Sequence, residues 1–220
     1  MPSRVVRVHG ADGELRAGIE AIREELGVTA EFPPEVEAAA SAAVAAPRLP
    51  SLDRTDIEFV TIDPAGAMDL DQALHIERVD GGYRVHYAIA DVAAFVSPGD
   101  PIDLEARRRG QTLYGADSKV PLHPPVISEG AASLLPGEVR PALLWTILVD
   151  ETGEGTDVTV ERALVRSRER HDYDTVQAAL DAEPGIRIYK QYAARYQLGY
   201  TQQASEDLSV PAYTGSSSAR

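Results

Sequence analysis

The chain has 220 residues, a formal net charge of −14 at pH 7 and no cysteine. Its 44% apolar and 25% charged residues are typical of a soluble globular protein with one domain and a smaller appendage. Without cysteine, disulfide scaffolds, thiolate metal sites and cysteine nucleophiles are excluded, and a reducing cytoplasm is favoured. The acidic charge argues against a protein that coats nucleic acid by bulk attraction, although a local basic channel remains compatible with it. No apolar run approaches 18 residues and no signal peptide is recognisable, so neither a membrane span nor secretion is expected.

Two helices are predicted in the first fifty residues. Apolar residues recur at spacings of four, three and four between Leu15 and Leu26, and Gly27 follows as a stop signal, which predicts a helix over 13–26. Residues 33–47 are alanine-rich, with prolines at the start and beyond the end, and predict a second helix. We interpret residues 1–50 as an N-terminal helical cap.

A β-hairpin is predicted after a first strand at 57–62. The stretches at 73–79 and 83–90 alternate between apolar and polar residues and are separated by Asp80-Gly81-Gly82. If Asp80-Gly81 forms a two-residue turn, Asp71 lies opposite Ala90. A turn at Gly81-Gly82 shifts the pairing by two, and in either register Asp91 comes next to Asp71.

The remaining pattern predicts an α+β fold with a mixed or mostly antiparallel sheet and flanking helices. Residues 51–182 are interpreted as one domain, and residues 183–220 as a tyrosine-rich tail with a helix over about 187–198 and a disordered end. Within the domain we expect a helix from Asp103 or Pro101 to Gly110, one helical turn near 127–132, strands at 142–150 and 156–167, and a helix at 172–180.

Three aspartates lie within nine positions directly after the first strand: Asp63, Asp69 and Asp71. Carboxylate oxygens are hard ligands that suit Mg²⁺, and two such ions roughly 3.5–4 Å apart can hydrolyse a phosphodiester. Asp69 and Asp71 point to the same side if their segment is extended. Turn, cap and solvated positions explain the three residues equally well from spacing alone.

The order of several motifs resembles the catalytic domain of the ribonuclease II/R (RNB-domain) family. The motifs are FVTIDPAGAMDLDQAL, AIADV, EARRRG, TLY, PLHPP, SLLPGEVRPAL and YDTVQ, and they run collinearly between Asp56 and Leu180. Members of that family are processive 3′→5′ exoribonucleases that use Mg²⁺ and release nucleoside 5′-monophosphates. The resemblance implies the same fold and activity.

The resemblance also implies which residues hold the metal. Asp63, Asp69 and Asp71 match three of the four clustered acidic residues of the family and would be both catalytic and metal-binding. Gln72 stands where the family usually has the fourth acid. Its carbonyl oxygen could coordinate the cation or bond to a metal-bound water. Asp91 is expected to support these ligands without binding the metal itself.

RNA contacts are expected of four further residues. Tyr114 matches the tyrosine that packs against the terminal nucleotides, and a core tyrosine is the alternative interpretation. Arg107, Arg109 and Arg140 would supply local positive charge for phosphates, although solvated helix and strand faces explain most arginines equally well.

The main hypothesis is therefore an Mg²⁺-dependent 3′→5′ exoribonuclease acting on single-stranded RNA in the cytoplasm. The resemblance ends after Leu180, so we expect only the N-terminal part of the catalytic domain, without the family's later arginine and S1-type domain. The first alternative is a non-catalytic remnant of the same fold that binds metal or RNA. The second is a structural or interaction protein that works through the tyrosine-rich tail.

Overall fold

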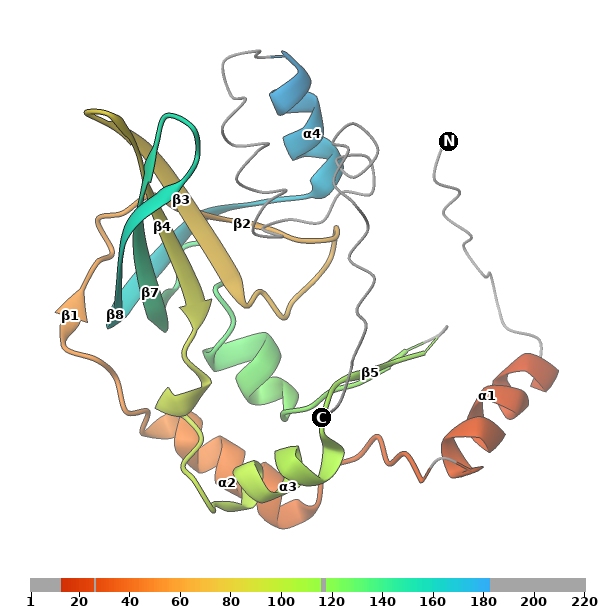
Figure 1. Cartoon of the computed structure of the whole chain (residues 1–220). Helices are drawn as coiled ribbons and strands as arrows, with labels where there is room; N and C mark the ends of the chain where they lie inside the picture. The colour runs from red at the N-terminus through yellow and green to blue at the C-terminus, as the bar shows by residue number, and fades with distance from the viewer. Residues whose placement is uncertain (1–12, 26, 116–117, 183–220) are drawn as a thin grey trace, which may run out of the picture. The chain divides into compact units, whose positions relative to one another are not determined.

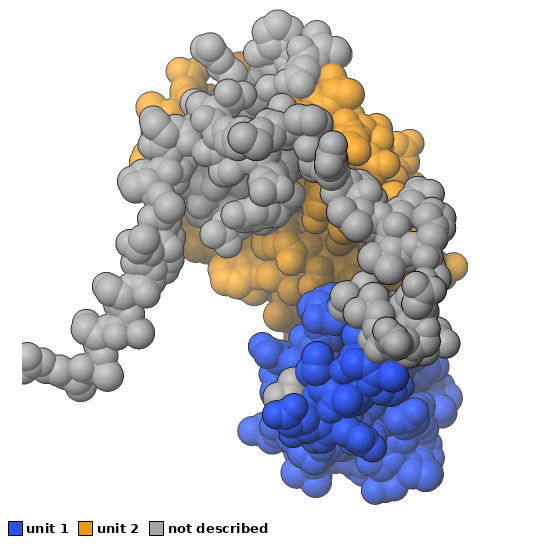
Figure 2. All heavy atoms as spheres, turned by 90° about the vertical axis from the view of Figure 1, so that its right-hand side faces the viewer, with its two compact units in different colours: residues 1–47, 95–127 blue, residues 48–94, 128–220 orange. Residues whose placement is uncertain are grey.

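A computed structural model describes residues 13–25, 27–115 and 118–182. The predictions for the tail after residue 182 lie outside these residues. Internal contacts divide the chain into two compact units, which Figure 2 colours separately: unit 1 comprises residues 1–47 and 95–127, and unit 2 comprises residues 48–94 and 128–220. The predicted N-terminal cap thus belongs to the same unit as residues 95–127. The sequence analysis had assigned those residues to the domain at 51–182.

Unit 1 is built around two packed helices, α2 (Pro34–Ala45) and α3 (Pro101–Arg109). Val36 and Ala40 of α2 and Ile102 of α3 are buried, and this burial explains why the later helix joins the N-terminal unit. The Asp100 side chain accepts a hydrogen bond of 2.8 Å from the Asp103 amide, so α3 begins at Pro101. The unit also contains α1 (Gly13–Glu25) and the short strands β5 (Leu113–Tyr114) and β6 (Lys119–Val120).

Unit 2 is a sheet whose strand pairing forms a closed ring (Figure 1). The strand order is β1-β8-β2-β3-β4-β7, and β7 pairs with β8 in addition. β8 runs parallel to β1 and β2 and antiparallel to β7, whereas all the other pairs are antiparallel, which confirms the predicted α+β class. The strands are β1 (Leu52–Asp53), β2 (Phe59–Ile62), β3 (Gln72–Val79), β4 (Gly82–Ala90), β7 (Val139–Asp150) and β8 (Gly155–His171).

The hairpin of β3 and β4 has the register predicted for a turn at Asp80-Gly81. Val79 pairs with Gly82, and Gly81 has a φ of 78°, a conformation that glycine adopts readily. The pairing continues one residue before the start of β3, because the amide of Ala90, the last residue of β4, donates a hydrogen bond of 2.8 Å to the carbonyl oxygen of Asp71.

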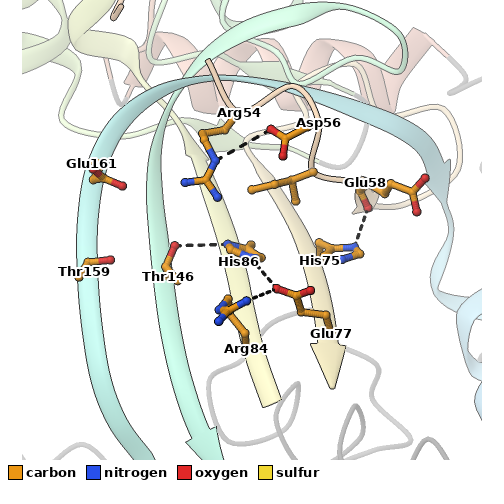
Figure 3. Close-up of a pocket in the computed structure, with 11 residues that line it drawn as sticks. Arg54, Asp56, Glu58, His75, Glu77, Arg84, His86, Thr146, Thr159 and Glu161 are labelled. Carbon is orange, nitrogen blue, oxygen red and sulfur yellow. Dashed lines mark hydrogen bonds and ion pairs between the residues drawn. The ribbon is translucent and has the colours of Figure 1, made fainter. Parts of the chain in front are cut away.

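The inner face of the sheet is apolar at one end and polar at the other. Ala73, Ala88 and Leu144 pack with Phe59 and Val165 in the main core. Two and four residues nearer the hairpin, the same face carries polar side chains around a pocket of about 400 Å³ (Figure 3). They include His75, His86, Glu77, Arg84 and Thr146.

Three short helical elements complete the described chain. The 3₁₀ turn η1 (Val92–Ala94) follows β4, and the turn predicted near 127–132 is a π-helix, η2 (Val126–Ala131). The last is α4 (Tyr173–Ala182), which begins after Asp172, whose side chain accepts a 2.7 Å hydrogen bond from the Thr175 amide. Over the described ranges, none of the helices has the length and apolar character that crossing a bilayer requires.

Candidate carboxylate site

The three predicted aspartates meet at one edge of the sheet. Asp63 directly follows β2 and Asp71 directly precedes β3. Because β2 and β3 are antiparallel neighbours, the end of one strand and the start of the next lie at the same edge. The Asp63 amide also bonds to the carbonyl oxygen of His171 on β8, at 3.1 Å, which anchors this position from the other side.

The loop that carries Asp69 is held by a buried serine. The Ser133 hydroxyl accepts a hydrogen bond from the Leu70 amide at 3.0 Å and donates one to the carbonyl oxygen of Met68 at 2.6 Å. The Leu134 amide then donates to the carbonyl oxygen of Leu70 at 2.8 Å. Both neighbours of Asp69 are thus fixed to the segment that precedes β7. The sequence analysis gave Ser133 no role, since 63 residues separate it from Leu70.

The carboxylates are crowded enough to oppose each other's ionisation. Burial raises the pKa of Asp63 to about 6, with further contributions from the negative charges of Asp71 and Asp69. Arg170 opposes this shift and also donates a 2.8 Å hydrogen bond to Ala67 in the loop. The pKa of Asp71 is raised as well, mainly by desolvation. Asp71 is an exposed residue, whereas Asp63 is half-buried, so we regard Asp63 as the carboxylate whose ionisation is opposed more strongly.

The donor set at this edge fits a hard divalent cation. Burial and neighbouring negative charge raise the pKa of Asp63 and Asp71, so a positive charge would stabilise their ionised forms, and carboxylate oxygens are the ligands Mg²⁺ takes in proteins. In the described part of the chain, no three His, Asp or Glu side chains already stand in a metal-binding arrangement. Binding would therefore require the aspartate side chains to reorient.

Gln72 is the first residue of β3, and its side chain is engaged on both sides. The Tyr87 hydroxyl donates a hydrogen bond to its Oε1, and a hydrogen bond from the Gln72 side chain lowers the pKa of Asp71 against the larger effect of desolvation. Burial and the charge of Asp71 raise the pKa of Tyr87 to about 12, so its hydroxyl keeps its proton.

Asp91 lies next to the cluster along the backbone, as predicted, but its side chain binds an arginine. The residue is 2% exposed, and one carboxylate oxygen, Oδ2, lies 2.7 Å from Nε and 2.6 Å from Nη2 of Arg162 on β8. Arg162 also donates a 3.2 Å hydrogen bond to the carbonyl oxygen of Arg48. This network fixes the end of β4, immediately after the residue that bonds to Asp71.

Tyr173 is a neighbour of the site to which the sequence analysis assigned no role. Burial raises its pKa, and the negative charges of Asp63 and Asp71 raise it further, which places its hydroxyl within the field of the carboxylates. The YDTVQ motif was the only signal for this residue.

The four residues expected to contact RNA differ in their surroundings. Tyr114 in unit 1 is 76% exposed, so the alternative of a core tyrosine is wrong. Arg107, also in unit 1, is exposed and bonds to Asp103 with Nε 3.0 Å from both carboxylate oxygens. Arg140 in unit 2 donates a 3.1 Å hydrogen bond to the carbonyl oxygen of Ser133.

Arg109 is a buried structural residue. Its side chain is 5% exposed, stacks 3.7 Å from the ring centre of Phe32 and donates a 2.8 Å hydrogen bond to Glu105. Hydrogen bonds and charge from Arg108, and then from Arg109, hold the pKa of Glu105 at about 2. The charge of Arg109 is thus neutralised within unit 1, and among the three arginines it is the least suited to phosphate contact.

Comparisons of the sequence and of the structure with known proteins agree with each other. The family model described as "RNB domain" matches residues 52–208. Ribonuclease R of Acidithiobacillus ferrooxidans is 36% identical over 135 residues, which cover 61% of this chain and 31% of that protein. An Arabidopsis thaliana protein named "Inactive exonuclease DIS3L2" is 37% identical over 137 residues, which cover 61% of this chain and 13% of that protein.

Among solved structures, Mycoplasma genitalium RNase R in complex with double-stranded RNA superimposes with a TM-score of 0.69 at 29% sequence identity. The match covers 79% of this chain and 32% of that one. The chain therefore spans less than a third of the length of each of these proteins.

Proposed function

Because the chain belongs to the RNB domain family, we propose that it hydrolyses single-stranded RNA from the 3′ end and releases nucleoside 5′-monophosphates with the help of Mg²⁺. The observation that carries this proposal is the meeting of Asp63, Asp69 and Asp71 at one sheet edge, where burial and then the charges of the other two aspartates raise the pKa of Asp63 to about 6. The cysteine-free composition favours the cytoplasm as the place where this substrate is met.

In this mechanism the three aspartates would hold the cation. Because the pKa values of Asp63 and Asp71 are raised, these two side chains would carry their full negative charge only once a cation is present or the pH exceeds the pKa. Bound Mg²⁺ would supply charge stabilisation at the scissile phosphate and lower the pKa of the attacking water. Ser133 and Arg170 keep the Asp69 loop in place through their bonds to Met68, Leu70 and Ala67.

The substrate would be bound by an exposed aromatic ring and by cationic side chains. Tyr114 offers a ring on which a base can stack, an interaction worth about 1–3 kcal/mol for each base. Exposed Arg107, and Arg140 in the unit of the carboxylates, are suited to phosphate contact. Arg109 is left out of this set because its side chain is buried and paired with Glu105.

A second candidate function is binding of metal or RNA without turnover. Gln72 brings no charge to the site, and its carbonyl oxygen already accepts a hydrogen bond from Tyr87. A relative named as an inactive exonuclease is as similar to this chain as a relative named as a ribonuclease.

The deciding experiment is degradation of a 5′-labelled single-stranded RNA by the full chain with Mg²⁺. We expect stepwise shortening from the 3′ end by the wild type, complete loss in Asp71→Asn, and no loss in Asp80→Asn, a matched change at the exposed hairpin turn. If neither the wild type nor the variants shorten RNA while all bind it with equal affinity in fluorescence anisotropy, the non-catalytic function is supported and the exonuclease proposal fails.

A further inference from the structure

The ring of strands is open along the first half of β8. Among the described residues, β1 pairs with β8 at Ala163 and Leu164, and β2 pairs with it only from Ser167 onward. Residues 155–162 therefore pair with β7 alone, and all of them are exposed. An exposed strand with one unpaired edge is a template on which a further strand can add.

The backbone groups of Val158 and Val160 point away from β7 along this edge. The carbonyl oxygen of Leu164 accepts a 2.9 Å hydrogen bond from the amide of Arg54, the residue after β1. Backbone groups of successive strand residues alternate between the two sides, and the β7–β8 register is unbroken here, so even-numbered residues face the edge. The Val158 amide agrees, because it donates a 2.9 Å hydrogen bond to the side chain of Asp157. The edge thus offers the amide and carbonyl groups of two valines to an added strand.

The side chains along the edge define what such a strand should carry. Val158 and Val160 are 52% and 48% exposed on the outer face. Asp157, Thr159 and Glu161 alternate with them, and Thr159 and Glu161 line the pocket on the inner face (Figure 3). A matching segment therefore has a basic residue between two aliphatic ones. Its aliphatic side chains would lie beside the valines, and its basic side chain, opposite Thr159, would have a carboxylate at each diagonal position.

Two triplets of this kind lie outside the described residues, at 6–8 (VRV) and at 186–188 (IRI). The first belongs to unit 1 and the second to unit 2, the unit of β8. The second triplet also follows Pro184-Gly185, a pair that favours a turn. Because β8 directly precedes α4, a turn soon after α4 can bring this triplet back toward β8.

We propose that the free edge of β8 is the docking site of residues 186–188 of the same chain, which add to it as an antiparallel strand. Arg187 lies opposite Thr159 in this pairing and faces the carboxylates of Asp157 and Glu161, while the two isoleucines cover the valines of the outer face. The tail helix expected from the sequence over about 187–198 then begins after residue 188.

The length of the intervening chain supports this assignment. β8 covers roughly 36 Å along its path from Val160 to His171, and the straight distance is shorter because β8 bends over the pocket (Figure 3). α4 and the residues from Ala182 to Ile186 span up to about 29 Å, a length that matches the bent strand. The chain approaches from the His171 end of β8, so the added strand runs antiparallel to it.

Hydrogen exchange of the full chain, followed residue by residue by NMR, tests the docking without cation or RNA. In the wild type, the Val160 amide should exchange at least about tenfold more slowly than in Arg187→Glu, which places a third negative charge between Asp157 and Glu161. The Thr159 amide points to β7, so it should exchange equally in both proteins and reports that the sheet remains folded. Adding Glu161→Arg to Arg187→Glu should restore most of the protection, because the two charges are exchanged.

Two controls separate this docking from a general effect of charge. Arg195→Glu makes the same change elsewhere in the tail, and Arg7→Glu makes it in the other triplet; both should exchange like the wild type. Equal exchange of the Val160 amide in the wild type and in Arg187→Glu would overturn the proposal. A loss of protection in Arg7→Glu alone would assign the edge to residues 6–8, and protection that rises with protein concentration would assign it to the tail of a second copy. Either result overturns docking of the chain's own tail.

Discussion

Arg162 contacts a single oxygen of Asp91 through both Nε and Nη2, and that carboxylate is almost completely buried. The pair joins the end of β4 to β8, and Arg162 also reaches the backbone of Arg48. Asp91, which the sequence analysis placed beside the carboxylate cluster, therefore serves mainly to fix the end of β4, the strand that bonds to Asp71.

Replacing Arg162 by leucine is expected to lower the free energy of unfolding by about 2–3 kcal/mol, because it leaves the buried charge of Asp91 without a partner. This loss is at or below the lower end of the range for breaking a fully buried ion pair, because the Arg162 side chain is partly exposed. Urea denaturation measures the change. Arg168→Leu, which loses one bond to the Thr55 carbonyl oxygen, should cost clearly less, and equal losses would contradict the assigned role of the pair.

Ser133→Ala is expected to destabilise unit 2 by about 1–3 kcal/mol, because the buried Leu70 amide loses its hydrogen-bond partner and the Met68 carbonyl loses a donor. Hydrogen exchange should show the Leu70 amide losing protection more than the amides of the β3–β4 hairpin. Ser51→Ala, at an exposed position, is the control. Uniform loss of protection over the unit would mean that Ser133 does not act locally on the Asp69 loop.

Asp63 should make the cation-free protein less stable as the pH rises. Its pKa is raised to about 6 in the folded protein from 3.8, so the folded state binds the proton more tightly. The associated stability is complete below pH 3.8 and is lost as the pH rises through 6. In the presence of a chelator at pH 7.5, Asp63→Asn should exceed the wild type in stability by about 1 kcal/mol, after discounting for solvent screening.

Thermal unfolding of the two proteins at pH 4 and pH 7.5 measures this difference, which should be smaller at the lower pH. Saturating Mg²⁺ should stabilise the wild type more than the variant. A wild type that is more stable than Asp63→Asn at pH 7.5 without a cation would contradict the crowding of the three carboxylates.

Arg109→Ala is expected to destabilise unit 1 by about 2–4 kcal/mol, because it removes the stack on Phe32 and leaves Glu105 with one fewer partner. Arg107→Ala removes only an exposed pair with Asp103 and should cost less than about 1 kcal/mol. Circular dichroism melts compare the two. If Arg109→Ala instead weakens RNA binding without any loss of stability, its interpretation as a structural residue is wrong.

Tyr114→Ala should weaken binding of a single-stranded oligonucleotide by about 5–150-fold, which corresponds to the loss of one stacked base, and should leave the melting temperature unchanged. Tyr114→Trp should retain most of the affinity because it preserves an aromatic surface. Fluorescence anisotropy at one fixed salt concentration provides the comparison. Equal affinities for the alanine variant and the wild type would remove Tyr114 from the binding surface.

Local features of this protein could be predicted from its sequence, and long-range ones could not. Alternation and the Asp80-Gly81-Gly82 segment predicted the hairpin and left two registers open, of which the structure has the one that places Asp71 opposite Ala90. The two-residue strand β1 was not among the predicted strands, because it owes its structure to pairing with Ala163 and Leu164.

The same limit applies to the site. The spacing of the three aspartates left a metal site and ordinary turn or cap positions open, and the resemblance to the family was needed to choose between them. The contacts of Ser133 and of Arg162 depend on the register of distant strands, which no local pattern records.

The ring of strand pairing has a consequence for the order of folding during synthesis. Among the described residues β8 is the last strand of the sheet, yet it pairs directly with β7, β1 and β2. Until residue 171 has left the ribosome, β1 and β2 lack their parallel partner and the Asp63 amide lacks the carbonyl of His171. Pairings of such high sequence separation slow folding, so a nascent chain would hold its hairpin early and complete the carboxylate edge only at the end.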